Sequence, residues 1–157
     1  MSYYFEFDPN HRILRGQFLD HVTDDELVDY YQVAALLSDS LRPKIGVTDL
    51  SRATVSVRGE TVRNLAKLPP AMPDENRPRF IVAESDHTFG LARMFQMHGE
   101  ATRPNLHVTR STEEAWEVLG ITETEFKPIS KSLESTLRAL REYDATTADH
   151  SVKIRRR

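Results

Sequence analysis

The chain has 157 residues, of which 39% are hydrophobic and 29% charged, and it has no cysteine, which excludes disulfides, thiolate catalysis and cysteine-ligated zinc. No apolar run approaches the roughly 20 residues of a membrane-spanning helix, and the N-terminus lacks the pattern of a secretory signal. The net charge of −3 combines −5 in residues 1–119 with +2 in residues 120–157. An acidic body argues against a nucleic-acid-binding face, so we expect no nucleic-acid binding. From the missing cysteines, membrane span and secretory signal we expect a cytoplasmic protein without membrane insertion.

The N-terminal third predicts a β-hairpin, a helix and a buried strand. The β-rich runs 3–7 and 12–18 flank "DPNH", a turn with proline, so we expect them to pair antiparallel. Thr23 and Glu26 form a capping-box pattern before a segment with apolar residues at helical spacing. The short β-branched run 45–49 then predicts a buried strand.

Helical and strand patterns alternate in the rest of the first 120 residues. We expect helices at 58–68 and 87–98 and in "STEEAWEVLG", and strands at 79–83 and 106–109. Ser111 and Glu114 form the capping box of the last helix, and Gly120 ends it. Strands that return through helices form mostly parallel sheets. Residues 1–120 therefore predict an α/β domain in which helices pack on a mixed five-strand sheet, with an antiparallel hairpin followed by parallel strands.

The composition changes after Gly120. Residues 121–143 predict an extra C-terminal amphipathic helix whose apolar stripe is Ile129, Leu133, Leu137 and Leu140. An uncovered stripe of this kind marks an interface, so we expect it to pack on its own domain or on a second copy, with a homodimer slightly favoured. Residues 144–157 have almost no apolar content and predict a disordered basic tail.

Sequence patterns of catalysis and metal binding are missing. The six histidines form no HExxH or comparable cluster, and neither a GxSxG motif nor a glycine-rich phosphate-binding motif occurs. Asp49 ends a central strand, as the phosphate-accepting aspartate of a receiver domain does. A receiver also needs an acid pair after its first strand to hold magnesium, and "FEFDPN" supplies none. We therefore expect no enzyme activity, no metal and no cofactor.

The stretch "DLSRATVSVRG", residues 49–59, lies where a predicted strand passes to a predicted helix. Ser56 is a candidate N-cap, because a serine hydroxyl can accept from a free amide at a helix start. Arg58 adds positive charge beside amides that favour anions, and Gly59 leaves the first turn unencumbered. The stretch fits a capped helix start, and it also fits a contact with an anion or a partner.

Three segments resemble a known family. "VTDLSRATVSVRGETV" resembles the strand–turn–helix region of the STAS-like (SpoIIAA-like) domain family, which includes anti-sigma-factor antagonists. "IVAESDHTFGLARMF" and "LHVTRSTEEAWEVLG" are similar to segments of its uncharacterised bacterial branch. The resemblance covers residues 1 to about 120. It implies a regulatory protein-interaction module whose partner is a protein such as a kinase or a sigma-factor regulator.

The family's phosphorylated serine lies in a D-S-S-G motif at the helix start, and this chain departs from that motif. The matching positions fall near Val57, Arg58 and Gly59, so no serine stands there, although Ser56 is one or two residues away. We expect a partner surface without the usual serine-phosphate switch. Phosphate on Ser51 or Ser56 would contradict this expectation.

The candidate partner-binding residues lie in one predicted surface turn, where binding groups are commonly found. They are Asp49, Ser51, Ser56, Arg58 and Gly59. The alternative is a domain that binds a small ligand or a lipid-like molecule, because some STAS-like relatives are grouped with lipid-carrier folds. Its pocket would be lined by Phe89, Met94, Phe95 and Met97, although Met and Phe at helical spacing more often fill a core.

Overall fold

The computed structural model describes residues 2–135 and 137–139. The predicted tail at 144–157 and the end of the predicted 121–143 extension, including Leu140, lie outside the described residues. Within the described part, no helix is long and apolar enough to cross a membrane.

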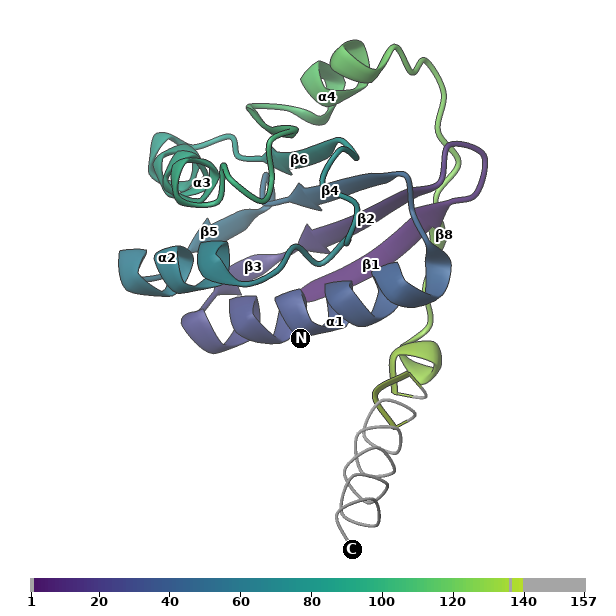
Figure 1. The fold of residues 1–157 in the computed structure, drawn as a ribbon, viewed down its shortest axis with the longest axis horizontal. Coiled ribbons are helices and arrows are strands. Elements are labelled where there is room, and N and C mark those ends of the chain that lie inside the picture. Colours follow the sequence, from purple (N-terminus) through teal and green to yellow (C-terminus); the bar gives the residue numbers. More distant parts are fainter. Residues whose placement is uncertain (1, 136, 140–157) are drawn as a thin grey trace, which may run out of the picture.

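The described chain forms an α/β fold with one large mixed sheet and one small sheet (Figure 1). The large sheet has the order β7-β6-β4-β2-β1-β8, from β1 (Tyr3–Asp8), β2 (Ile13–Phe18), β4 (Ile45–Asp49), β6 (Arg79–Val82), β7 (Leu106–Thr109) and β8 (Lys127–Pro128). The small sheet pairs β3 (Asp20–Val22) with β5 (Ala53–Val55). The helices are α1 (Asp24–Leu41), α2 (Gly59–Lys67), α3 (Asp86–His98) and α4 (Thr112–Leu119), with further helical residues at 131–135 and 137–139.

The predicted strands and their directions are confirmed. β1 pairs antiparallel with β2, and β2, β4, β6 and β7 run parallel. The expected count of five strands is wrong, because β8 adds a sixth strand at the free edge of β1. β8 has two residues, one of them Pro128, and proline is tolerated only at such edges, so the sequence carries no local strand pattern there.

Helix ends mostly follow the sequence signals. The hydroxyls of Thr23, Ser85 and Ser111 cap α1, α3 and α4, each accepting from the amide three residues on. Gly120 ends α4 with a positive φ of 68°, a conformation that glycine adopts without strain.

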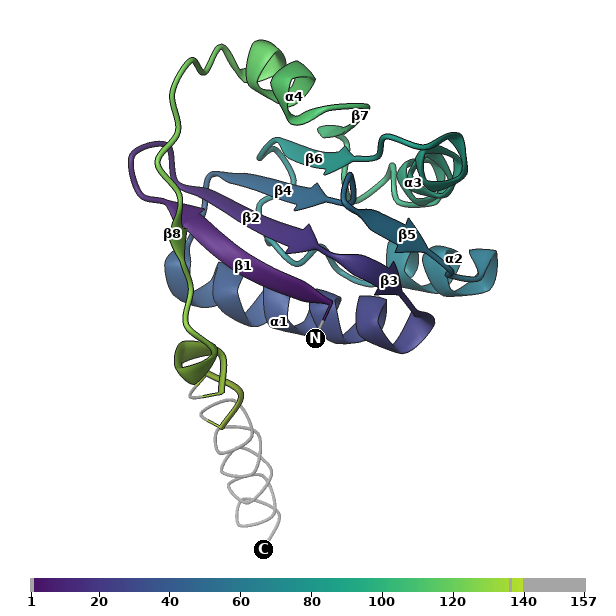
Figure 2. The same cartoon turned by 180° about the vertical axis from the view of Figure 1, so that it is seen from behind.

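One face of the large sheet is covered by α1, α2 and α3. Figure 1 shows α1 and α2 in front of the strands, and Figure 2, seen from behind, shows β1 and β2 in front of α1. Tyr30 of α1 lies among the rings of Tyr3, Phe5 and Phe18, with centroids 5.4, 4.9 and 4.5 Å away. Its hydroxyl is hydrogen-bonded to the Thr48 hydroxyl at 2.7 Å. This aromatic cluster is the centre of the larger core.

The opposite face carries a smaller core. Alternate strand residues point to opposite faces, so Ile13, Val47 and Phe80 point away from α1. They pack with Ala115 of α4, and Trp116 lies against the same cluster. The chain after α4 then runs to β8 at the other edge of the sheet (Figure 2).

The C-terminal helical residues pack on their own domain, which is one of the two expected arrangements. Leu133 and Leu137 lie against the larger core. Arg138 donates to Asp29 of α1 at 2.8 Å, and Tyr3 donates to the same carboxylate. Burial opposes ionisation of Asp29, but the hydrogen bonds from Tyr3 and Arg138 outweigh it and lower the pKa of this carboxyl. The homodimer stays a prediction, which light scattering of the full-length chain tests.

Candidate functional site

The stretch 49–59 is not a single turn, which corrects the expectation that its candidate residues share one surface loop. Strand β5 lies in the middle of it and pairs with β3, so Asp49 and Ser51 come before β5 and the other three candidates after it. The alternation of buried Val55 and Val57 with exposed Thr54 and Ser56 is the strand signal that could have revealed β5.

Asp49 is buried at the end of β4, with 4% of its surface exposed. The expectation that it lies on the surface is therefore wrong. One carboxylate oxygen accepts from the Ser51 amide at 2.9 Å and from the Ser51 hydroxyl at 2.6 Å. The other oxygen accepts from the Thr112 hydroxyl of α4 at 3.4 Å. Asp49 therefore fixes the loop after β4 and connects it to the start of α4.

The expectation that Ser56 caps α2 is wrong. Arg58 is the N-cap residue, and its side chain makes no capping hydrogen bond. Ser56 instead donates its amide to the Val22 carbonyl at 2.9 Å, as part of the β3–β5 pairing. The Arg58 amide donates to Asp24 of α1 at 2.9 Å, and its Nε donates to the same carboxylate at 3.0 Å. These bonds, led by the one from the Arg58 amide, lower the pKa of Asp24. The cap comes from another helix, which no local pattern indicates.

A polar crevice of about 470 Å³ lies at the carboxyl ends of β4, β6 and β7, on the face away from α1. It contains Asp49 and Ser51 but not Ser56, Arg58 or Gly59. Its other lining residues, which the sequence reading missed, are Arg15, Gln17, Arg52, Glu84, Arg110, Ser111, Thr112 and Glu113. Ligands of open α/β sheets bind outside the carboxyl ends of the strands, so this is the candidate functional site.

Two β2 side chains of the crevice are held in place. Arg15 donates to Glu6 through Nε at 2.8 Å and Nη2 at 2.6 Å, and its guanidinium lies 3.9 Å from the centre of the Phe126 ring. Gln17, which is 5% exposed, accepts from the Tyr4 hydroxyl at 2.9 Å. The polar residues Arg15 and Gln17, two positions apart in "RILRGQF", could have indicated this polar face of β2.

Arg110 and Arg52 differ in how far they are restrained. Arg110 donates to the Glu84 carbonyl and to Asp86, each at 2.9 Å, and its guanidinium lies 3.9 Å from the centre of the Phe89 ring. Arg52 is exposed, and its side chain has no partner among the described residues. The crevice therefore combines a fixed framework with one cation free to meet another molecule.

A second cavity, of about 180 Å³, lies on the other face between the sheet and α1, α2 and α3. Of the four residues expected to line a ligand pocket, only Phe95 lines this cavity. Phe89 lies under Arg110 instead, and Met97 is 69% exposed. The prediction that Phe89, Met94 and Met97 line a pocket is therefore wrong, although a cavity does lie beside Phe95.

No group of three or more histidine, aspartate or glutamate side chains in the described part of the chain could hold a metal ion. No family model matches the chain, and no curated protein is significantly similar to it.

Proposed function

We propose that the protein is a non-catalytic regulatory module, similar in kind to STAS-like domains, that binds a protein partner at the polar crevice. The observation that carries the proposal is a set of fixed loops that present exposed charges of both signs. These charges form the charged rim, which we define as Arg52, Glu84, Arg110 and Glu113.

The loops of the charged rim are ordered by contacts beneath them. Asp49 holds the loop after β4 and reaches Thr112, and Arg110 connects the loop after β7 to the loop after β6. A surface that is already ordered loses less conformational entropy when it binds. The ordered loops therefore favour direct recognition of a folded partner, because the site does not have to assemble first.

The mixture of charges suits a partner with complementary charges. Electrostatic complementarity across an interface contributes more to specificity and association rate than to affinity. The partner classes implied by the family resemblance are a kinase and a sigma-factor regulator, and both remain part of the proposal.

Binding in this proposal does not depend on a phosphoserine. Ser51 donates its hydroxyl to the buried Asp49 carboxylate at 2.6 Å. A phosphate there would add about −1.5 to −2 charges beside that carboxylate, and repulsion opposes this. Ser56 is exposed but lies beyond β5, outside the crevice. Phosphopeptide mapping of protein from the native host should therefore find neither serine stoichiometrically phosphorylated.

The partner is tested by affinity capture from a lysate of the native host, with the captured proteins quantified and then purified for direct binding. Arg52→Glu should reduce partner binding about tenfold, a change of about 1.4 kcal/mol, since it reverses a crevice cation that no described residue restrains. Arg63→Glu on α2 is the matched control, because Arg63 is also exposed but lies outside the crevice. Equal binding by the wild type and Arg52→Glu would contradict the proposal.

A further inference from the structure

The 180 Å³ cavity beneath α1, α2 and α3 is too large to be ordinary packing space. Protein cores are close-packed, with few voids larger than a water molecule. Ala34, Ala71 and Ala92 line the cavity where longer side chains could fill it. An apolar cavity of about 150 Å³ in another protein holds benzene, whereas sites for drug-sized ligands have about 300–1,000 Å³. The space therefore fits a single ring or a short branched chain, and it is too small for a long-chain lipid.

Two buried cations border this apolar space. Arg79 and Arg103 line the cavity and are only 8% and 4% exposed. Within the described residues, neither has a carboxylate within the 4.0 Å of an ion pair. Burial lowers the pKa of both groups, and the charge of Arg103 lowers that of Arg79 further. Both charges thus border the same cavity, and neither forms an ion pair within the described residues.

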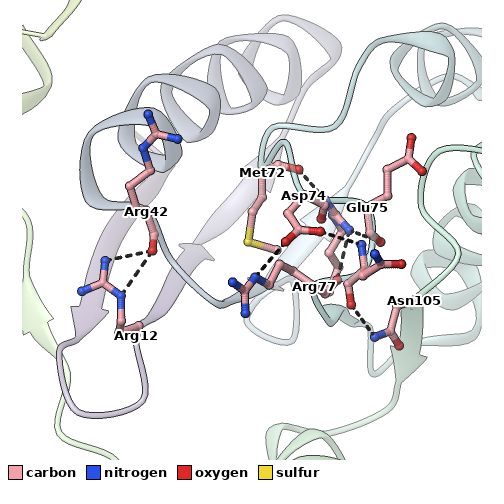
Figure 3. A network of polar contacts seen from close by, with 9 residues as sticks. Arg12, Arg42, Met72, Asp74, Glu75, Arg77 and Asn105 are labelled. Carbon is pink, nitrogen blue, oxygen red and sulfur yellow. Dashed lines mark hydrogen bonds and ion pairs between the residues drawn. The ribbon is translucent and has the colours of Figure 1, made fainter.

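Arg79 is held by the loop between α2 and β6. It donates to the backbone carbonyls of Met72, Asp74, Glu75 and Arg77, with distances of 2.7 to 3.1 Å for the last three. Figure 3 shows Met72, Asp74 and Glu75 of this loop close together, with Arg77 beside Asp74 and Asn105 nearby. These carbonyl oxygens accept from the two Nη groups, and the Asp74 and Glu75 carboxylates partly offset the effect of burial by raising the pKa of Arg79. None of the described carboxylates, however, forms an ion pair with its guanidinium.

Arg103, which lies between α3 and β7, is held in a similar way by carbonyl groups at the end of α2. It donates to the carbonyls of Ala66 at 2.9 Å and Leu68 at 3.1 Å, and to the Tyr31 hydroxyl at 3.4 Å. Tyr31 also lines the cavity, and burial raises the pKa of its hydroxyl, which stays protonated at neutral pH. The hydroxyl proton has no acceptor among the described residues, so it can donate to a bound molecule.

We propose that this cavity binds a small apolar carboxylate, either a single aromatic ring or a short branched chain bearing one acid group. The apolar walls bury the body of the molecule, and its carboxylate lies toward Tyr31, Arg79 and Arg103 and supplies the missing negative charge. The Nη groups of both arginines already donate to protein oxygens, so the Tyr31 hydroxyl and the two Nε–H groups are the donors left for this carboxylate among the described residues. Charge-assisted hydrogen bonds of this kind are among the strongest in proteins. The site is on the opposite face from the crevice and does not depend on the proposed partner.

The four methionines allow a direct test in the full-length protein. Benzoate is titrated into protein with ¹³C-labelled methionine methyl groups and followed by NMR. The Met72 signal should shift saturably, because Met72 lines the cavity, and that of Met97 should not, because Met97 is 69% exposed and outside it. An unchanged Met72 signal, or equal shifts of both signals, would overturn the proposal.

Two substitutions separate the charge from the cavity. Arg103→Met should weaken benzoate binding at least tenfold but leave the binding of toluene, a neutral ring of similar size, within twofold. Arg93→Met is the control, because Arg93 is exposed on α3 and outside the cavity. Ala92→Leu should abolish binding of both molecules by filling the space. If Arg103→Met binds benzoate as the wild type does, or a folded Ala92→Leu still binds it, the site is refuted. If Ala92→Leu fails to fold, the benzoate titration of the wild type, read from its Met72 and Met97 signals, decides whether the cavity binds the carboxylate.

Discussion

The two faces of the large sheet use the same strands for different purposes. On β2, Leu14 and Phe18 point to the face covered by α1, where they join the aromatic core. Arg15 and Gln17 point to the other face, where they line the polar crevice. Because side chains alternate along a strand, a single strand can stabilise the fold and furnish a site at once. Substitutions on the two faces should therefore affect different properties of the protein.

The largest effect is expected on the helix-covered face, at Gly16. A Cβ atom at this position would lie 2.2 Å from the Tyr30 hydroxyl oxygen and 2.3 Å from a ring carbon, so Gly16→Ala must displace Tyr30 from the aromatic core. We expect a loss of about 3 kcal/mol in the free energy of unfolding, measured by urea denaturation. The control is Gly90→Ala in α3, where an added Cβ meets nothing within 4 Å and alanine favours the helix. Similar stabilities of the two variants would show that Tyr30 is not tightly enclosed.

A smaller effect on stability, and a larger one on binding, is expected in the crevice. Asp49→Asn keeps the shape of the side chain but replaces charge-assisted hydrogen bonds to Ser51 by neutral ones. We expect it to cost about 1 kcal/mol of stability and to weaken partner binding, because the loop after β4 loses its anchor. Asp74→Asn is a control on an exposed loop outside the crevice. A full loss of fold in Asp49→Asn would place Asp49 with the core rather than with the site.

The smallest effect concerns pH and the C-terminal helical residues on the helix-covered face. The pKa of Asp29 is lowered in the folded protein, so its contribution to stability is present above the pKa of the unfolded chain. The contribution is lost as the pH falls through the lower folded pKa. The unfolding midpoints of wild type and Asp29→Asn should thus differ at pH 7 and converge once the pH has fallen below the folded pKa of Asp29, in denaturation experiments from pH 7 into the acid range. A difference that persists at low pH would show that Asp29 acts through packing instead.

Local signals in the sequence predicted the main elements well, and contacts distant in sequence explain what was missed. Thr23, Ser111 and Gly120 act within their own helices, so their patterns could be recognised. The cap of α2 comes from Asp24, which is 34 residues away, and no local pattern reports it.

The crevice could be predicted only in part for the same reason. The position of Asp49 at a strand end pointed to this edge of the sheet, but Glu84 and Arg110 reach it only through the parallel order of β4, β6 and β7. The predicted pocket wall lay on α3 alone, whereas the cavity is lined by residues that the fold brings together from the sheet and three helices. Arg79 and Arg103 were not predicted to line it, because arginine is usually exposed.

Strand β8 has a consequence for how the molecule avoids self-association. Without it, the aromatic segment "YYFEF" would form an open sheet edge, a template on which other chains can stack. β8 pairs with Glu6 and Phe7, and the Ile129 amide donates to the Phe5 carbonyl at 2.9 Å. β8 is two residues long, and Pro128 has no N–H to offer an incoming strand. A short, proline-containing strand thus shields the Phe5–Phe7 part of β1 from pairing with another chain.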